Sequence, residues 1–287
     1  MIDYQKLMNW PFEEIQHTIS ERDTMLYALG IGLGTDPNDR NQLRFVYEKD
    51  LLAMPSMASI LCYPGNWLKD PRTGVDHLRV MNGGTQFVIH EPLPIRGTFK
   101  STPRVLDIVD KGREKGAVLR LERKVYDARS GAPVCTVTTT SFCRDHGGFG
   151  GPASAAEAMP TVKAPDTQPD ASVTFATLPN LALIYRLSGD LNPLHVDPDV
   201  ARVAGFDQPI LHGLSTLGVA THALVKACCG YDPARISWMR ARYTSFVVPG
   251  DTVRTDLWRD ESRVRFRCVV PSRNAVVLDY GEASLRV

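Results

Sequence analysis

The chain of 287 residues is long enough for about two domains and a large buried core. Hydrophobic residues make up 43% of it and charged residues 23%, which is typical of a globular protein that folds in water. Lysine and arginine number 33 against 32 aspartate and glutamate residues, a formal net charge of +1. Because this balance supplies no basic field, we expect no nucleic-acid partner.

The sequence carries no signal that would send the chain into or across a membrane. No apolar run approaches the length of a membrane span, and the first residues contain no apolar signal-peptide core. The final residues, 285–287, do not resemble a peroxisomal signal. The cysteines have no metal-ligand spacing. They are Cys62, Cys135, Cys143, Cys228, Cys229 and Cys268. We therefore expect a reduced, cytoplasmic protein that binds neither membrane nor metal.

In the first half of the chain, residues 23–29 predict a helix, followed by the glycine run 30–34. No strand precedes that run, so we interpret it as a turn and not as a dinucleotide-binding loop. Residues 94–98 turn into a strand, and residues 118–126 and 134–142 predict an antiparallel pair of strands joined near Ser130-Gly131.

A stretch rich in glycine, alanine and proline, residues 144–170, separates the two halves and has no hydrophobic period. Such composition is typical of a linker. We divide the chain into an N-terminal repeat (1–145), a linker (146–170) and a C-terminal repeat (171–287).

In the second half, residues 181–187 predict a helix that Gly189 can end in a left-handed conformation. Residues 214–228 have the i, i+3, i+4 apolar spacing of an amphipathic helix, and Cys228-Cys229 at its end are expected to be small packed residues. Residues 264–270 alternate as a half-buried strand does. One long helix with several antiparallel strands in each half indicates an α+β fold.

The two halves also resemble each other in sequence. Residues 25–29 match residues 183–187 at an offset of 158, which indicates an internal duplication. At that offset Asp190 and His195 correspond to Gly32 and Pro37, so the chain would hold one reactive site, in its second half.

The densest group of reactive side chains follows the helix predicted at 181–187. Asp190 and His195 lie five positions apart in a loop restrained by Gly189 and Pro193. A carboxylate and an imidazole that converge can hold a water molecule and move protons near neutral pH. In the alternative interpretation, Asp190 caps the next segment and His195 only packs.

A second group surrounds Gly213, directly before the helix predicted at 214–228. Its N–H would lie at the positive end of a helix dipole, where it can stabilise an oxyanion. Close packing alone would also explain a glycine there. For the neighbouring His212 we expect a structural role.

The segments YRLSGDLNPLHVDP (185–198) and AGFDQPILHGLSTLG (204–218) resemble the signature of the hydratase 2 family, the MaoC-like (3R)-specific enoyl-CoA hydratases. The similarity extends from residues 20–30, through 147–151, to 248–251. It implies a double hot-dog fold, in which each of two repeats wraps a curled antiparallel sheet around one long helix.

The same resemblance implies reversible hydration of trans-2-enoyl-CoA to (3R)-3-hydroxyacyl-CoA in fatty acyl metabolism, such as β-oxidation, with no cofactor beyond the CoA of the substrate. Asp190 and His195 would form the catalytic dyad, with Asn192 orienting the loop and Gly213 donating to the thioester carbonyl. We assign His195 to water activation and Asp190 to the Cα proton. The N-terminal repeat would bind the acyl chain, and the resemblance is compatible with a homodimer.

Further substrate contacts are also carried over from the resemblance. They are Asn82, Gly83, Lys111, Leu191, Pro193, Leu194 and Tyr243. Relatives tend to have His-Gly-Glu where this chain has Asn82-Gly83-Gly84, which affects acyl-chain preference. A turn lysine and a core aromatic are the alternatives for Lys111 and Tyr243. Mesaconyl-CoA-type hydration, acyl-thioester dehydration, thioester hydrolysis and non-catalytic acyl-CoA binding remain open as functions.

Overall fold

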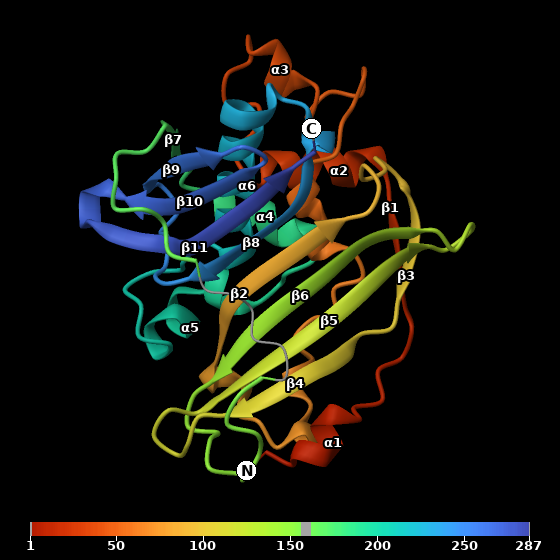
Figure 1. The fold of residues 1–287 in the computed structure, drawn as a ribbon, viewed down its shortest axis with the longest axis vertical. Helices are drawn as coiled ribbons and strands as arrows, with labels where there is room; N and C mark the ends of the chain where they lie inside the picture. Colours follow the sequence, from red (N-terminus) through yellow and green to blue (C-terminus); the bar gives the residue numbers. More distant parts are fainter. Residues whose placement is uncertain (1, 156–161, 287) are drawn as a thin grey trace.

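The computed structural model describes residues 2–155 and 162–286. A single antiparallel sheet of 11 strands runs through the described residues, in the order β1-β3-β5-β6-β2-β8-β11-β10-β9-β7, with β4 paired to β5 (Figure 1). The strands are β1 (Ile15–Ile19), β2 (Val80–Ile89), β3 (Gly97–Ser101), β4 (Arg104–Asp110), β5 (Ala117–Asp127), β6 (Pro133–Cys143), β7 (Ala171–Ala176), β8 (Ile236–Tyr243), β9 (Thr252–Asp260), β10 (Arg263–Val270) and β11 (Ala275–Leu285).

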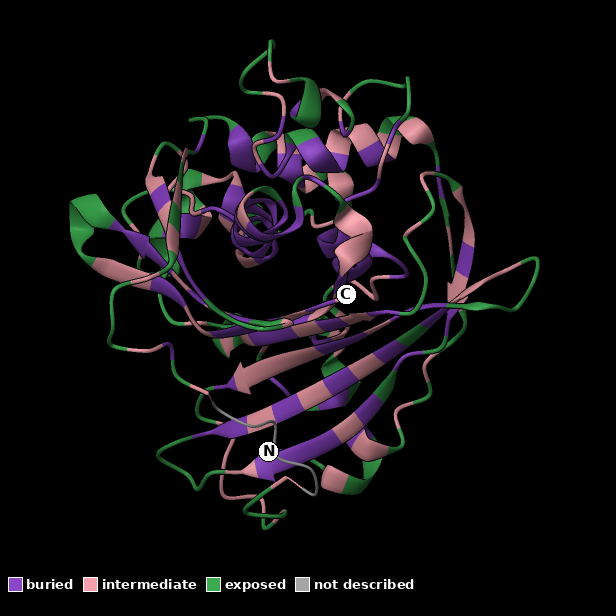
Figure 2. Ribbon diagram, turned by 45° about the horizontal axis from the view of Figure 1, so that its top comes forward, coloured by how far each residue is buried: buried purple, intermediate pink, exposed green. Residues whose placement is uncertain are grey.

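The helices are short with one exception. They are α1 (Tyr4–Met8), α2 (Glu21–Leu29), α3 (Arg40–Leu43), α4 (Leu181–Tyr185), α5 (Pro198–Val203) and α6 (Gly213–Cys229). Helix α6 is apolar on almost every side, so the curved sheet encloses it and most of its 17 residues are buried (Figure 2). Gly230 ends it in a left-handed conformation, with a φ of 59°. Among the described helices, none has the length and apolar character needed to cross a bilayer.

The sheet is symmetric about its central pair, β2 and β8. From β2 the strands run outward as β6, β5, β3 and β1, and from β8 as β11, β10, β9 and β7. The chain visits each half in the same order, so the fold is a double hot-dog, as the resemblance implied. The boundaries at residues 145 and 171 stay a prediction, and residues 156–161 of the predicted linker lie outside the described residues.

One expectation about the fold was wrong: the N-terminal half has no long helix among its described residues. The 3₁₀ helix η1 (Pro55–Ile60) begins where the offset of 158 places the start of α6 (213 − 158 = 55). The chain then turns at Cys62, whose φ is 50°, and continues into Pro64 and Gly65. A proline there lacks the N–H that a continuing helix needs and restricts the residue before it, so η1 stops after about two turns.

Other predicted elements are confirmed. Strands β5 and β6 pair across the turn at Ser130-Gly131, and β10 covers the alternating run 263–270. Helix α4 continues into the 3₁₀ helix η5 (Arg186–Ser188), and Gly189 follows with a φ of 113°. The glycine run 30–34 is a turn after α2. These features are local, and local spacing was enough to predict them.

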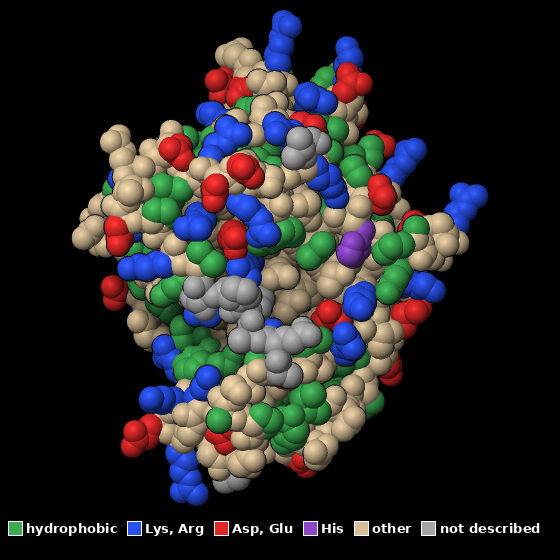
Figure 3. Space-filling model, viewed as in Figure 1, with side chains coloured by type: hydrophobic (Ala, Val, Ile, Leu, Met, Phe, Trp, Pro, Cys, Tyr) green, Lys and Arg blue, Asp and Glu red, His purple; other side chains and the backbone are tan. Residues whose placement is uncertain are grey.

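The surface seen in Figure 3 carries lysine and arginine side chains interspersed with aspartate and glutamate. Several of these charges are paired across the strands of the C-terminal half. Glu282 of β11 accepts from Arg240 of β8, at 2.5 Å, and from Arg263 of β10. Positive charge on this part of the sheet is therefore balanced locally.

Candidate active site

The loop that follows α4 brings Asp190 and His195 together. The N–H of Asn192 donates to the Asp190 carboxylate at 3.3 Å, and the Asn192 side-chain oxygen accepts from the N–H of Leu194 at 3.1 Å. The second bond caps the 3₁₀ helix η6 (Pro193–His195), in which proline occupies the first position. Asn192 thus orients the turn that presents His195.

His195 is only 8% exposed, and its Nδ1 lies 2.8 Å from the carbonyl oxygen of Ile210. A carbonyl can only accept, so Nδ1 carries the proton and Nε2 keeps a free lone pair. Burial lowers the pKa of His195, although the Ile210 bond and the Asp190 charge oppose it. The ring is therefore a neutral base near neutral pH.

His212 supports both members of this pair. Its Nε2 donates to the backbone oxygen of Asp190 at 3.1 Å, and its ring stacks on that of His195 with centroids 3.7 Å apart. The Tyr185 ring also packs against the His212 ring, with centroids 5.0 Å apart. Burial, and secondly the neighbouring His195, lowers the pKa of His212 to about 3. His212 thus has the structural role expected of it: it supports the loop of residues 189–195, called the dyad loop below.

Asp190, His195 and His212 form a compact cluster. One nitrogen or oxygen atom from each lies within 4.8 Å of the other two. Such a group can hold a water molecule, and a carboxylate with two imidazoles is also a ligand set that transition metals accept. Sequence spacing revealed no metal-type grouping because His212 joins the cluster from 17 residues beyond His195. The absence of a metal stays a prediction.

Gly213 is the first residue of α6, and the first N–H groups of a helix have no acceptor within it. The His212 side chain makes no cap bond there. A Cβ on Gly213 would lie 3.0 Å from Cε1 of Tyr243, closer than side-chain carbons normally approach. The Tyr243 hydroxyl donates to the Thr85 hydroxyl oxygen at 3.1 Å. Burial raises the pKa of Tyr243. Tyr243 therefore forms a wall beside a helix end that can receive an oxyanion.

The remaining predicted substrate contacts lie in three places: the dyad loop, strand β2 and the turn between β4 and β5. Leu191, Pro193 and Leu194 belong to the dyad loop itself, and the Leu191 side chain is exposed. Asn82 and Gly83 lie in β2 just before Gly84, which pairs with β8 next to Tyr243. Lys111 lies in the turn between β4 and β5, where its N–H donates to Gly116. No described hydrogen bond or ion pair connects the Lys111 side chain to the dyad loop.

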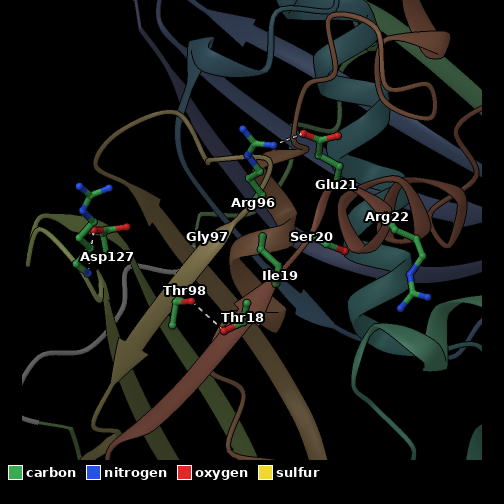
Figure 4. Close-up of a pocket in the computed structure, with 10 residues that line it drawn as sticks. Thr18, Ile19, Ser20, Glu21, Arg22, Arg96, Gly97, Thr98 and Asp127 are labelled. Carbon is green, nitrogen blue, oxygen red and sulfur yellow. Dashed lines mark hydrogen bonds and ion pairs between the residues drawn. The ribbon is translucent and has the colours of Figure 1, made fainter.

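A surface pocket of about 770 Å³ lies elsewhere, between α2 and the turn before β3 (Figure 4). Some of its charged groups are already paired: Arg96 pairs with Glu21 at 3.0 Å, and Asp127 accepts from the N–H groups of Arg129 and Ser130. No member of the dyad loop lines it. This pocket is therefore separate from the candidate site.

None of the six cysteines, all of which the structure describes, is placed to act as a nucleophile. All six are buried and unpaired in disulfides. Burial raises the pKa of Cys229 to about 12 and also raises that of Cys228. A thiol held protonated is unreactive, which agrees with the packing role expected for this pair.

Two protein families match the chain in succession. Residues 17–145 match the MFE-2 hydratase 2 N-terminal domain, and residues 160–278 match the MaoC-like domain. The chain is 38% identical to the peroxisomal enoyl-CoA hydratase 2 of Arabidopsis thaliana over 279 residues, which cover 92% of this chain and 90% of that protein.

Two further comparisons span nearly the whole chain. The 3-hydroxyacyl-thioester dehydratase Y of Mycobacterium tuberculosis is 40% identical over 272 residues, 91% of each chain. The crystal structure of a MaoC-like dehydratase from Phytophthora capsici superposes with a TM-score of 0.86 at 35% identity and covers 98% of both chains. The relationship thus extends over both repeats and the fold as a whole.

Proposed function

Because this chain belongs to the hydratase 2 family of MaoC-like proteins, we propose that it catalyses the reversible, (3R)-specific hydration of trans-2-enoyl-CoA thioesters in fatty acyl metabolism. The observation that supports this proposal most strongly is the convergence of the Asp190 carboxylate and the His195 ring, whose Nε2 has a free lone pair, beside the N-terminus of α6. Hydration of a conjugated thioester requires a held water molecule, a base and an oxyanion donor.

In the proposed mechanism, water lies between Asp190 and His195. As its oxygen bonds to Cβ, Nε2 of His195 takes a proton, and the double-bond electrons move onto the thioester oxygen, where the Gly213 N–H stabilises them. The proton then passes from His195 to Asp190 and on to Cα, which restores the neutral imidazole and the carboxylate. One water is consumed, and no redox change occurs.

The chemistry proposed here uses no metal or redox cofactor, and CoA enters as part of the substrate. By analogy with the relatives, the N-terminal half would hold the acyl group, and Asn82, Gly83, Lys111 and Tyr243 would contact the substrate. A homodimer and a cytoplasmic location complete the proposal. Several relatives are named as peroxisomal proteins, so fractionation of the native host would test the location directly.

The test is an assay of trans-2-enoyl-CoA hydration by loss of the absorbance of the conjugated thioester, with chiral analysis of the product. We expect the (3R) alcohol. Asp190→Asn and His195→Gln should each lower kcat by about 10²-fold or more, because each removes a proton-transfer group. Asp199→Asn, which alters an exposed carboxylate paired with Arg202 in α5, is the matched control and should remain active.

Three results would contradict the proposal. Release of free CoA thiol without hydration would indicate a thioesterase, and tight binding without turnover would indicate an acyl-CoA-binding protein. Activity on acyl-carrier-protein thioesters alone would reassign the chain as a carrier-dependent dehydratase.

A further inference from the structure

Arg123 of β5 is a buried cation without an acidic partner among the described residues. Its side chain is 1% exposed. One terminal nitrogen donates to the carbonyl of Leu61 at 2.7 Å and the other to that of Ser59 at 2.8 Å. Both carbonyls lie at the end of η1, so Arg123 supplies hydrogen-bond donors to carbonyl oxygens at the point where this short helix stops. A guanidinium has five N–H donors and a full charge, and two neutral carbonyls leave that charge uncompensated.

The sheet register places Arg123 close to the candidate site. Arg123 pairs with Val137 of β6, which pairs with Phe87 of β2, and paired residues share one face of a sheet. Thr85, the partner of the Tyr243 hydroxyl, lies on that same face two residues before Phe87. Two strand spacings and two residues along a strand place the Cα atoms of Arg123 and Thr85 about 12 Å apart.

Tyr63 packs against the buried cation and lies within electrostatic range of Asp190. Its ring centroid is 5.5 Å from the central carbon of the Arg123 guanidinium. Burial, and secondly the negative charge of Asp190, raises the pKa of Tyr63 to about 12, against the opposing positive charge of Arg123. The Tyr63 hydroxyl is thus near enough to feel both charged groups, and the side chain is only half-buried.

The space around η1 is polar in other ways. The buried hydroxyls of Ser56 and Tyr185 gather near that of Tyr27, and none of the three makes a hydrogen bond of normal geometry among the described residues. The Tyr27 and Tyr185 rings lie 5.9 Å apart, and Tyr185 also packs on His212. A plain hydrocarbon bound here could form no hydrogen bond to these hydroxyls, whereas an oxygen-bearing group could.

We propose that the acyl group this enzyme binds ends in a carboxylate, which the Arg123 guanidinium receives in the N-terminal half beside Tyr63. The preferred substrates would then be enoyl-CoA thioesters of dicarboxylic acids. This inference rests on the proposed function and names the substrate class of the same site. Arg123 acts in it as a specificity residue, because it binds the far end of the substrate and takes no part in proton transfer.

The experiment compares kcat/KM for two series of trans-2-enoyl-CoA thioesters of matched chain length, one ending in carboxylate and the other in methyl. We expect the carboxylate series to be favoured at its best length by about tenfold or more, the size of effect that a buried charge-assisted bond supplies. Arg123→Met should lower the carboxylate-to-methyl ratio by a similar factor, and Arg123→Lys should give an intermediate ratio.

Arg120→Met is the matched control, because Arg120 lies in the same strand and forms its ion pair with Asp107. Its ratio should equal that of the wild type. The wild-type ratio alone decides the proposal if Arg123→Met fails to fold. A wild-type enzyme that hydrates the methyl series as well as or better than the carboxylate series would overturn the inference and leave the proposed function intact. Hydration of neither series would instead remove the proposed function.

Discussion

Two buried histidines, His212 and His222, show how much the environment decides the behaviour of one residue type. His212 donates to the backbone oxygen of Asp190, whereas His222 of α6 stacks on Phe175 at 4.1 Å and has no described partner for either ring nitrogen. Burial is the main cause that lowers the pKa of each to about 3. Both rings are therefore neutral in the folded protein well below the pH at which an exposed histidine takes up a proton.

These shifts predict how stability depends on pH. Between pH 6.5 and about 3 the unfolded chain binds a proton at each histidine and the folded chain does not, so the free energy of unfolding should fall as pH falls through this range. Urea unfolding at a series of pH values measures it. His222→Leu should make the fall less steep. Equal slopes for wild type and His222→Leu would show that His222 is protonated in the fold.

At the scale of elements, the N-terminus of α6 is the feature that the proposed mechanism needs most. The helix begins at Gly213, directly after His212, whose ring stacks on His195. The Tyr243 ring packs over Gly213. A side chain at Gly213 would have to push the Tyr243 ring or the helix end away. Glycine thus allows the backbone donor and the tyrosine wall to lie side by side.

Gly213→Ala tests this arrangement. The added Cβ would start 3.0 Å from Cε1 of Tyr243, so the oxyanion donor should shift away from its position, and we expect kcat to fall by about 10- to 100-fold. Steady-state kinetics measures the effect, and thermal unfolding checks that the fold persists. Unchanged kcat in a folded variant would exclude the Gly213 N–H as the oxyanion donor.

The helices of the two halves illustrate where element prediction from sequence succeeds and fails. The apolar spacing of residues 214–228 predicted α6 correctly, because a fully enclosed helix carries its signal in its own residues. The corresponding segment of the first half is just as buried, yet it forms only η1. Pro64 and Gly65 mark that ending in the sequence, whereas the buried Arg123 that satisfies the last carbonyls comes from β5, about 60 residues away.

At the scale of the whole molecule, the two halves join through more than the β2–β8 pair. Ser215 of α6 donates to the backbone oxygen of Gly30 at 2.9 Å, and Ile31 packs directly on Gly218. A Cβ on Gly218 would lie 2.2 Å from Cγ2 of Ile31 and 2.9 Å from its Cβ. The glycine-containing turn after α2 therefore packs directly against α6, the central helix of the other half.

Gly218→Ala should destabilise the protein by about 1–3 kcal/mol, because neither the fully buried Ile31 nor the helix can move aside freely. Chemical unfolding measures the change. Combining Gly218→Ala with Ile31→Ala removes the 2.2 Å contact with Cγ2 and leaves only the 2.9 Å approach to Cβ, so the double variant should lose less stability than the two single variants summed. Additive losses would show that the two halves do not meet at this point.

The sequence by itself determined what depends on near neighbours along the chain. The loop from Gly189 to His195 is short and contains a left-handed glycine and a proline-led turn, and these bring a carboxylate and an imidazole into one small volume. Strands β5, β6 and β10 and helix α6 were predicted from the local pattern of their own residues. The Asp190–His195 pair was accessible from the sequence for this reason, whereas the double hot-dog architecture was implied by the family resemblance.

Only the tertiary structure decided what depends on residues distant in sequence. It places His212 against His195, it brings the Tyr243 ring to Gly213, and it encloses Arg123 beside Tyr63. None of these contacts has a local period or spacing, because each arises when a curved sheet and an enclosed helix bring separate segments together. The two residues of the proposed dyad thus come from one loop, whereas the contacts that support that loop and the acyl specificity proposed for Arg123 depend on the packing of both halves.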